Sequence, residues 1–268
     1  MQSRYYDWIG HHARNKPNKV AIVDLAIDRR LTYRELDARI TSLAAFLSRD
    51  CAIKQGDRVC IIAKSSLEAF ELQFACARIG AIFLPVNWRL TVHELEYIIT
   101  NATPGALLVE KEFAGVADQL ASQIEGCRVV EFSGGIEDTC YERGIAAHRG
   151  SPIESQSTDI DSHCLILYPS GTTGHPKGAM LSYRMMLANV LNFAPACITQ
   201  ESVFLCAMPT FHTGGLNCYS NPVFHAGGTV LIMRDFDPAS ALTLLEDRDA
   251  GITHFFGTPA HYLFISQQ

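Results

Sequence analysis

Short apolar runs alternate with longer amphipathic segments along most of this chain. Between the runs, apolar residues recur at helical spacing, as in residues 36–47. Strands that alternate with helices favour right-handed crossovers and parallel sheets covered on both faces. We therefore expect an α/β protein with doubly wound, mostly parallel sheets and helices on both faces. The expected strands are residues 20–26, 58–63, 81–86, 106–110, 128–132, 163–168, 202–207, 228–233 and 252–256.

Several helix starts carry explicit signals. Thr32 with Glu35, and Thr91 with Glu94, have the spacing of a capping box, in which each partner satisfies a backbone N–H group of the other. A charged turn at residues 28–30 precedes the first of these helices. Proline in the first helical position, at Pro238, predicts a later helix.

The alternating pattern lapses between residues 133 and 162. Its last part, residues 151–162, is polar and contains proline and several serines, which is typical of a connection between domains. We expect a first α/β lobe over residues 1–150, a linker over residues 151–162 and a second α/β lobe over residues 163–268.

Composition narrows the class of protein. The chain has 268 residues, of which 48% are hydrophobic and 19% charged, so it can bury a full core. A formal net charge of -6 argues against nucleic acid as its main partner. No apolar run approaches the roughly 20 residues of a transmembrane helix, and the N-terminus lacks the apolar core of a signal peptide. A cytoplasmic metabolic enzyme without a transmembrane segment is the expectation.

The nine cysteines form no CxxC pair, and most of them lie in apolar runs. An odd number of cysteines without a secretory signal is typical of the reducing cytoplasm, so we expect free thiols. The ten histidines form neither HxxxH nor HExxH, and we expect no structural zinc.

Residues 168–180, YPSGTTGHPKGAM, have the composition of a phosphate-binding loop. Glycines allow backbone N–H groups to turn toward an anion, hydroxyls donate further hydrogen bonds, and one ammonium neutralises a terminal phosphate. A strand is expected before the loop and a helix, residues 181–193, after it, which is the order of phosphate sites. The expected phosphate-binding residues are Ser170, Gly171, Thr172, Thr173, Gly174 and Lys177.

Two common nucleotide motifs are excluded by the spacing. Pro176 stands five positions after Gly171, and Ala179 rather than a hydroxyl residue follows Gly178, so the loop is not a Walker A motif. The dinucleotide pattern GxGxxG is absent from the segment. A surface loop that happens to be rich in glycine and threonine remains the alternative interpretation.

The stretch SGTTGHPKG resembles, almost letter for letter, the phosphate-binding signature of the adenylate-forming superfamily. This superfamily contains acyl- and aryl-CoA synthetases, peptide-synthetase adenylation domains and firefly luciferases. The resemblance continues through residues 31–36, 56–59, 80–87 and 209–215 and is greatest with the CoA-ligase branch. It implies that the chain is the N-terminal part of the large domain of such an enzyme.

The resemblance also implies a reaction. An ATP-dependent ligase would activate a fatty or aromatic acid as an acyl-adenylate, using ATP and Mg²⁺, and transfer it to CoA. By this resemblance Lys177 contacts the leaving pyrophosphate, Thr172 contacts the phosphates and Mg²⁺, and His212 lies beside the α-phosphate. Pro169 is a departure, since the family usually has threonine or another small polar residue there; proline removes one N–H donor.

Two short segments resemble the parts of the family that line the acyl pocket. These candidate substrate-binding residues are His212, Thr213 and Gly214 in one segment, and Gly257, Thr258 and Pro259 in the other. Simpler interpretations stay open: a buried histidine with one hydrogen bond, and an ordinary strand-to-helix turn.

Other functions stay open at this point: a peptide-synthetase adenylation domain, and a non-catalytic nucleotide-binding fragment. The identity of the acid and the formation of a homo-oligomer are open as well. In the family the motif Tyr-Gly-x-Thr-Glu, the ribose-binding aspartate and a catalytic lysine would follow Gln268. We therefore expect a truncated chain that is inactive alone.

Overall fold

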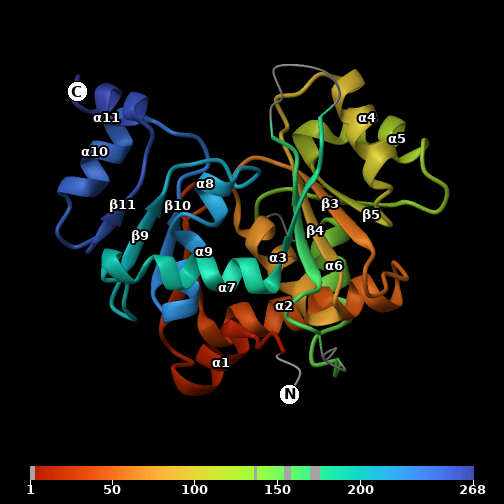
Figure 1. The fold of residues 1–268 in the computed structure, drawn as a ribbon, viewed down its shortest axis with the longest axis horizontal. Helices are drawn as coiled ribbons and strands as arrows, with labels where there is room; N and C mark the ends of the chain where they lie inside the picture. The colour runs from red at the N-terminus through yellow and green to blue at the C-terminus, as the bar shows by residue number, and fades with distance from the viewer. Residues whose placement is uncertain (1–3, 136–137, 154–157, 170–175) are drawn as a thin grey trace. The chain divides into compact units, whose positions relative to one another are not determined.

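The computed structural model describes residues 4–135, 138–153, 158–169 and 176–268 (Figure 1). The chain divides into two compact units. Unit 1 contains Met1–Asp7, Asp37–Ala63 and Glu68–Leu187. Unit 2 contains Trp8–Leu36, Lys64–Leu67 and Ala188–Gln268. Each unit is described by itself below.

Unit 1 is built on a six-stranded sheet with the order β6-β5-β3-β4-β7-β8. All neighbouring strands are parallel except β7 and β8, which are antiparallel. The expected run of parallel buried strands is therefore confirmed. The strands are β3 (Arg58–Ile62), β4 (Ile82–Val86), β5 (Ala106–Glu110), β6 (Arg128–Phe132), β7 (His163–Leu167) and β8 (Ala179–Ser182).

The core of unit 1 forms where helices cover this sheet. Leu95 and Ile98 of α4, together with Leu120 of α5, pack into one cluster with the apolar residues of β3, β4 and β5. The capping box that starts α4 is present, because the carboxylate of Glu94 accepts the N–H of Thr91 at 2.8 Å. The helices are α2 (Tyr33–Arg49), α3 (Leu67–Ile79), α4 (Val92–Ala102), η1 (Lys111–Phe113), α5 (Ala114–Ala121), α6 (Cys140–Ala147) and α7 (Tyr183–Asn192).

Unit 2 is built on a five-stranded sheet with the order β11-β9-β10-β1-β2, in which only β2 is antiparallel to its neighbour. Val23, Leu205 and Leu231 from three of these strands share a buried cluster with Ala241 of α10. The strands are β1 (Val20–Asp24), β2 (Arg29–Thr32), β9 (Val203–Cys206), β10 (Thr229–Ile232) and β11 (His254–Phe255). The helices are α1 (Trp8–Asn15), η2 (Ala194–Ala196), α8 (Thr213–Leu216), α9 (Ser220–Ala226), α10 (Pro238–Glu246) and α11 (Pro259–Ile265).

The two units are not consecutive lobes. Strand β1, near the N-terminus, pairs with β10, and β7 pairs with β4 across a long stretch of chain. This arrangement differs from the expected division into residues 1–150 and 163–268 with a linker at residues 151–162. The difference arises because strand pairing between distant segments leaves no trace in local hydrophobic periodicity.

Three elements differ from the sequence predictions. The phosphate-loop segment leads into strand β8, and α7 begins only at Tyr183, so the expected direct passage from loop to helix is wrong. The expected charged turn at residues 28–30 is partly strand β2, which lies at the edge of its sheet where arginines can remain solvated. Helix α6 lies in the stretch where the alternating pattern lapses.

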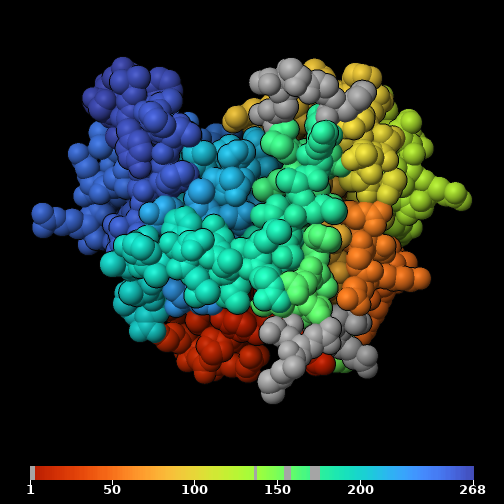
Figure 2. All heavy atoms as spheres, viewed as in Figure 1, coloured from red at the N-terminus to blue at the C-terminus, as the bar shows by residue number. Residues whose placement is uncertain are grey.

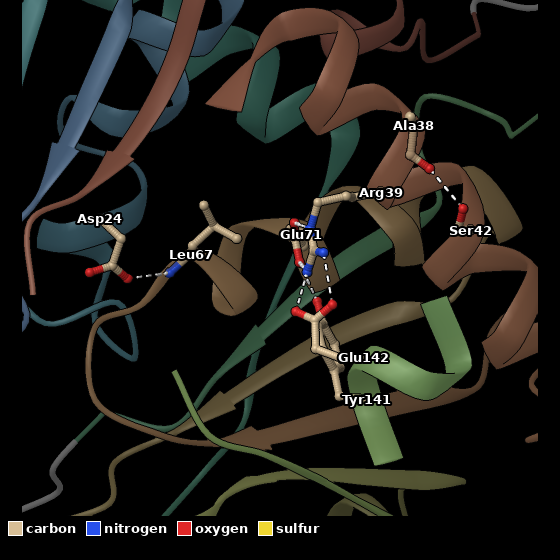
Figure 3. Close-up of polar contacts among 8 residues, drawn as sticks. All are labelled: Asp24, Ala38, Arg39, Ser42, Leu67, Glu71, Tyr141 and Glu142. Atoms are coloured by element: carbon tan, nitrogen blue, oxygen red, sulfur yellow. Dashed lines mark hydrogen bonds and ion pairs between the residues drawn. The ribbon is translucent and has the colours of Figure 1, made fainter. Parts of the chain in front are cut away.

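A buried ion network joins α2, α3 and α6 within unit 1 (Figure 3). The guanidinium of Arg39 donates to Glu71 and, through two nitrogens at 2.9 and 2.7 Å, to Glu142. The hydroxyl of Tyr141 donates to Glu71 at 2.5 Å. Burial, together with the Glu71 carboxylate, raises the pKa of Tyr141 well above its ordinary value. The network satisfies the buried carboxylate of Glu71 and the partly buried carboxylate of Glu142 with one guanidinium and one phenol.

Candidate active site

The phosphate-loop segment closes a hairpin at the edge of the unit 1 sheet. Leu167 at the end of β7 is paired with Ala179 at the start of β8, so residues 168–178 connect these two strands. Because β7 is parallel to β4, the loop leaves the sheet at the carboxyl ends of the parallel strands, where α/β sheets bind ligands. The predicted phosphate-binding residues Ser170, Gly171, Thr172, Thr173 and Gly174 lie outside the described residues.

The base of this hairpin is tightly packed. The hydroxyl of Tyr168 donates to Oδ1 of Asn101 at 2.6 Å, which fixes the ring. Burial raises the pKa of Tyr168. A Cβ atom on Gly178 would lie 2.9 Å from Cγ2 of Ile166 and 3.0 Å from Cζ of Tyr168. Glycine at this position therefore allows the two strands of the hairpin to close around the Tyr168 ring.

Lys177 precedes Gly178 directly and is exposed to solvent. Its position, at the end of the loop and just before β8, is held by the packed base of the hairpin. An ammonium that directly follows a segment of hydroxyl residues and glycines in the sequence suits a terminal phosphate. The assignment of Lys177 to the pyrophosphate stays a prediction.

The second group of candidate residues follows two neighbouring strands of unit 2. Strands β9 and β11 are parallel and in register, with Leu205 beside Phe255, so their carboxyl ends meet at one edge of the sheet. From β9 the chain continues to β10 on one side, whereas β11 lies on the other side of β9. The strand order therefore reverses between β9 and β11, and a ligand crevice in an open α/β sheet usually lies at such a point. The fold brings residues 212–214 and 257–259 to this edge.

His212 caps the short helix α8 with its imidazole. Nδ1 of the imidazole accepts the backbone N–H of Gly214 at 3.0 Å. The backbone N–H of His212 donates to the carbonyl oxygen of Pro209 at 3.1 Å. The glycines permit this tight turn, since a Cβ atom on Gly215 would lie 2.3 Å from that same carbonyl oxygen. Because Nδ1 accepts, a neutral imidazole carries its proton on Nε2.

The environment of His212 excludes one of the two interpretations of this residue. The side chain is exposed, as is that of Thr213, whereas Gly214 is buried. His212 is therefore not a buried core histidine. An exposed imidazole whose Nδ1 is occupied presents Nε2–H as a donor to a ligand.

The segment after β11 is a turn that begins α11. Gly257 is buried, and a Cβ atom there would lie 2.7 Å from Cβ of His261. The hydroxyl of Thr258 lies 2.7 Å from Nδ1 of His261, which also packs on Phe236 with 4.2 Å between the ring centroids. Burial lowers the pKa of His261. The sequence predicts only a structural role for this histidine, and its place three residues after Thr258 is the spacing of a capping box.

Helix α11 presents large apolar side chains to solvent next to this turn. Tyr262, Leu263 and Phe264 are 50%, 55% and 48% exposed. Figure 2 shows this C-terminal segment, drawn in dark blue, at the surface. Lys177 belongs to unit 1, and residues 212–214 and 257–259 belong to unit 2.

Metal ligands and thiols complete the description. Among the described residues, no group of three or more histidine, cysteine, aspartate or glutamate side chains is arranged to hold a metal ion. Thr172, the predicted Mg²⁺ ligand, lies outside those residues.

All nine cysteines are free thiols; Cys51, Cys60, Cys76 and Cys206 are buried and Cys197 is exposed. No described helix is both long and apolar enough to cross a membrane.

Comparisons with known proteins agree with this arrangement. The chain is 30% identical over 249 residues to an indoleacetate–CoA ligase from Aromatoleum aromaticum, a match that covers 92% of this chain and 48% of the relative. It is 32% identical over 260 residues to a feruloyl-CoA synthase from an Amycolatopsis species, covering 97% and 49%. The chain thus spans about half the length of these relatives.

A solved structure shares the fold. The crystal structure of ATP-bound MatB from Rhodopseudomonas palustris superimposes with a TM-score of 0.87 at 30% identity, over 98% of this chain and 51% of that protein. Residues 9–268 match the family described as AMP-binding enzyme. With nearly the whole chain inside that match, and with relatives that are CoA ligases, the chain belongs to the family of AMP-binding enzymes.

Proposed function

We propose that this chain is part of an AMP-forming carboxylic acid:CoA ligase that activates a fatty or aromatic acid with ATP. The observation that carries the proposal is the family membership over residues 9–268, with SGTTGHPKG at the carboxyl end of β7. Relatives named as ligases of indoleacetate and ferulate support CoA as the acceptor. An ATP-bound neighbour of the same fold supports ATP as the nucleotide.

The proposed reaction needs no protein nucleophile. A carboxylate oxygen of the acid attacks the α-phosphorus of ATP, and the bond to the bridging oxygen of pyrophosphate breaks. The thiolate of CoA then attacks the acyl carbon and AMP leaves. The protein's task is to hold the groups in line and to stabilise the negative charge that develops. Mg²⁺ bound to the phosphates would neutralise part of that charge.

Each candidate residue is given one role in this reaction. Lys177, exposed at the end of the loop, meets the charge on the leaving pyrophosphate. Thr172 and the neighbouring hydroxyl and glycine residues would donate to the phosphates, and Thr172 would help to hold Mg²⁺. His212 donates from Nε2–H to a carboxylate or α-phosphate oxygen, since its Nδ1 already accepts the amide of Gly214.

The acid is proposed to bind at the carboxyl edge of the unit 2 sheet. Thr213 and Gly214 lie at the end of one connection there, and Gly257, Thr258 and Pro259 at the end of the other. Aromatic rings lie beside the second connection: those of Phe255 and Tyr262 meet edge to face at 5.6 Å, and Phe236 packs against His261 in a tilted arrangement. This environment suits an apolar or aromatic acid. Nine free thiols support a reducing, cytoplasmic location.

The test uses the complete enzyme with ATP and Mg²⁺ and a panel of fatty, indoleacetic and hydroxycinnamic acids. We expect acid-dependent exchange of pyrophosphate into ATP, and AMP and thioester release only when CoA is present. Exchange without a CoA-dependent product would support a peptide-synthetase type of adenylation domain. Nucleotide binding without exchange for any acid would support a non-catalytic nucleotide-binding protein and contradict the proposal.

A further inference from the structure

Three of the four residues Lys64–Leu67, which we call the bridging segment, contact the end of β1 and the connections that follow β9 and β10 in unit 2. They follow β3 in the chain but belong to the same compact unit as β1, β9 and β10, which are neighbours in its sheet. The contacts, each 3.2 Å long, join Leu67 N–H to Asp24 Oδ2, Thr210 N–H to Ser65 Oγ, and Lys64 Nζ to Asp235 Oδ2. The segment therefore ties the connections after these strands together.

One end of the bridging segment is anchored by a buried carboxylate. Asp24 is the last residue of β1 and only 3% exposed. Its two oxygens accept the N–H of Leu67 at 3.2 Å, as drawn in Figure 3, and the N–H of Ala26 at 3.1 Å. Burial raises the pKa of Asp24, and these hydrogen bonds oppose that rise. A carboxylate satisfied in this way fixes the backbone of the segment to the sheet.

Ser65 of the bridging segment contacts the backbone of Thr210. The Ser65 hydroxyl that accepts its N–H is buried, as is Thr210 itself, with 6% and 3% exposure. A buried N–H without an acceptor is costly, so this contact determines where Thr210 lies. His212 follows two residues later, in a turn closed by its bond to the carbonyl of Pro209. A displacement of Thr210 would therefore move the imidazole.

We propose that Ser65 is a positioning residue for adenylation. Through the backbone of Thr210 its hydroxyl aims Nε2–H of His212 at the acid and the α-phosphate, and Ser65 itself contacts neither. The inference rests on the proposed function for its effect on rate, but its structural part can be measured without any reaction.

The adjacent residue offers a matched control. Ser66 is also buried, at 1% exposure, and its hydroxyl has no hydrogen-bond partner among the residues that the structure describes. Ser65→Ala and Ser66→Ala remove the same atom from consecutive positions of the bridging segment. Only the first removes the acceptor of Thr210. Ser65→Thr keeps a hydroxyl and serves as the conservative variant.

Hydrogen–deuterium exchange of the complete enzyme tests the structural part. In Ser65→Ala we expect the Thr210 amide to exchange roughly tenfold faster, the factor that corresponds to about 1.4 kcal/mol. In Ser66→Ala the Thr210 amide should exchange at the wild-type rate. Unchanged exchange in Ser65→Ala would overturn the proposal, whether or not the enzyme activates any acid.

Pyrophosphate exchange with the best acid of the panel tests the catalytic part. Ser65→Ala should lower kcat roughly tenfold or more and raise KM for the acid, with KM for ATP unchanged, and Ser65→Thr should recover part of the loss. Equal losses in Ser65→Ala and Ser66→Ala would overturn the positioning role. A wild-type enzyme that activates no acid would instead contradict the proposed function.

Discussion

Lys177 is the residue of the proposed phosphate site whose positive charge is easiest to test by substitution. In the complete enzyme, Lys177→Ala should lower the rate of pyrophosphate exchange by about 10²- to 10³-fold, the usual loss for one preorganised donor to a transition state. The KM for the acid should change little, because the ammonium is proposed to meet charge on the leaving group. Lys111→Ala, an exposed lysine in the same unit, is the control. A wild-type exchange rate in Lys177→Ala would remove this residue from the site.

Gly178 shows how the base of the loop depends on the absence of a side chain. A Cβ atom would lie 2.9 Å from Ile166 and 3.0 Å from the Tyr168 ring, so Gly178→Ala must displace the Ile166 side chain and crowd that ring. We expect a loss of about 1–3 kcal/mol in the free energy of unfolding, measured with urea, and, if the loop binds phosphate as proposed, weaker ATP binding. Gly115→Ala in α5 meets no atom within 4 Å and should be neutral or slightly stabilising. Equal stability of the two variants would contradict this packing.

Among the elements, helices α2, α3 and α6 depend on the buried ion network. The Glu71 side chain is completely buried, and its removal would leave Arg39 with only Glu142 and the Tyr141 hydroxyl without its acceptor. Glu71→Ala should therefore lower the free energy of unfolding by about 3–5 kcal/mol. Glu71→Gln, which keeps an oxygen acceptor, should lose less than Glu71→Ala.

An exposed ion pair in the same unit is the control for this prediction. Arg184 and Asp161 are paired in a largely solvent-exposed position, with side chains 57% and 64% exposed. Arg184→Ala should change the urea midpoint far less than Glu71→Ala, because water replaces an exposed partner at little cost. Comparable losses in the two variants would show that the network contributes no more than a surface pair.

Helices α1 and α9 contact each other through a half-buried histidine. His12 Nε2 donates to the carbonyl oxygen of His225 at 2.9 Å. Burial lowers the pKa of His12 below its ordinary value of 6.5, and the nearby His11 and Lys16 lower it further. The pKa of His225 is lowered in the same way. Protons therefore bind the unfolded chain more readily than the folded one.

This difference predicts a pH dependence of stability. The contribution of His12 is fully present above pH 6.5 and is lost as the pH falls below that value toward the folded pKa. Urea unfolding at pH 7.5 and 5.5 should show a smaller free energy of unfolding at the lower pH. In His12→Gln, whose amide can still donate to the carbonyl of His225, the difference between the two pH values should shrink. An unchanged difference would exclude His12 as a contributor.

For the molecule as a whole, local sequence patterns predicted the positions of helices and strands better than they predicted which strands pair with each other. The capping box of Thr91 and Glu94 is present because it involves only neighbouring residues. The sequence did not indicate that β1 and β2 complete the sheet of β9, β10 and β11, since strands of similar composition can pair in many orders. Strand β8 escaped prediction because its four residues merge with the apolar pattern of α7.

Some residues of the candidate site could be predicted from the sequence and others could not, because only some of them belong to local motifs. His212 and Gly257 carry motifs that could be recognised in isolation, and the fold brings both segments to one sheet edge. Ser65 and Asp24 carry no motif, and their roles depend on hydrogen bonds to residues far away in the sequence. Such long-range contacts become visible only when the chain is folded.

The remaining prediction concerns what the 268 residues can do alone. The chain spans about half the length of relatives that make acyl-CoA, 48% and 49% in the two examples above. Groups that stabilise one transition state act together, so a part of the constellation retains far less than a proportionate part of the rate. We expect the purified chain to bind ATP weakly and to form no acyl-CoA at enzyme-like turnover. A CoA-dependent assay with the acid panel measures this, with the complete enzyme as the positive control. Thioester formation by the short chain at a comparable rate would show that residues 1–268 contain the whole catalytic apparatus.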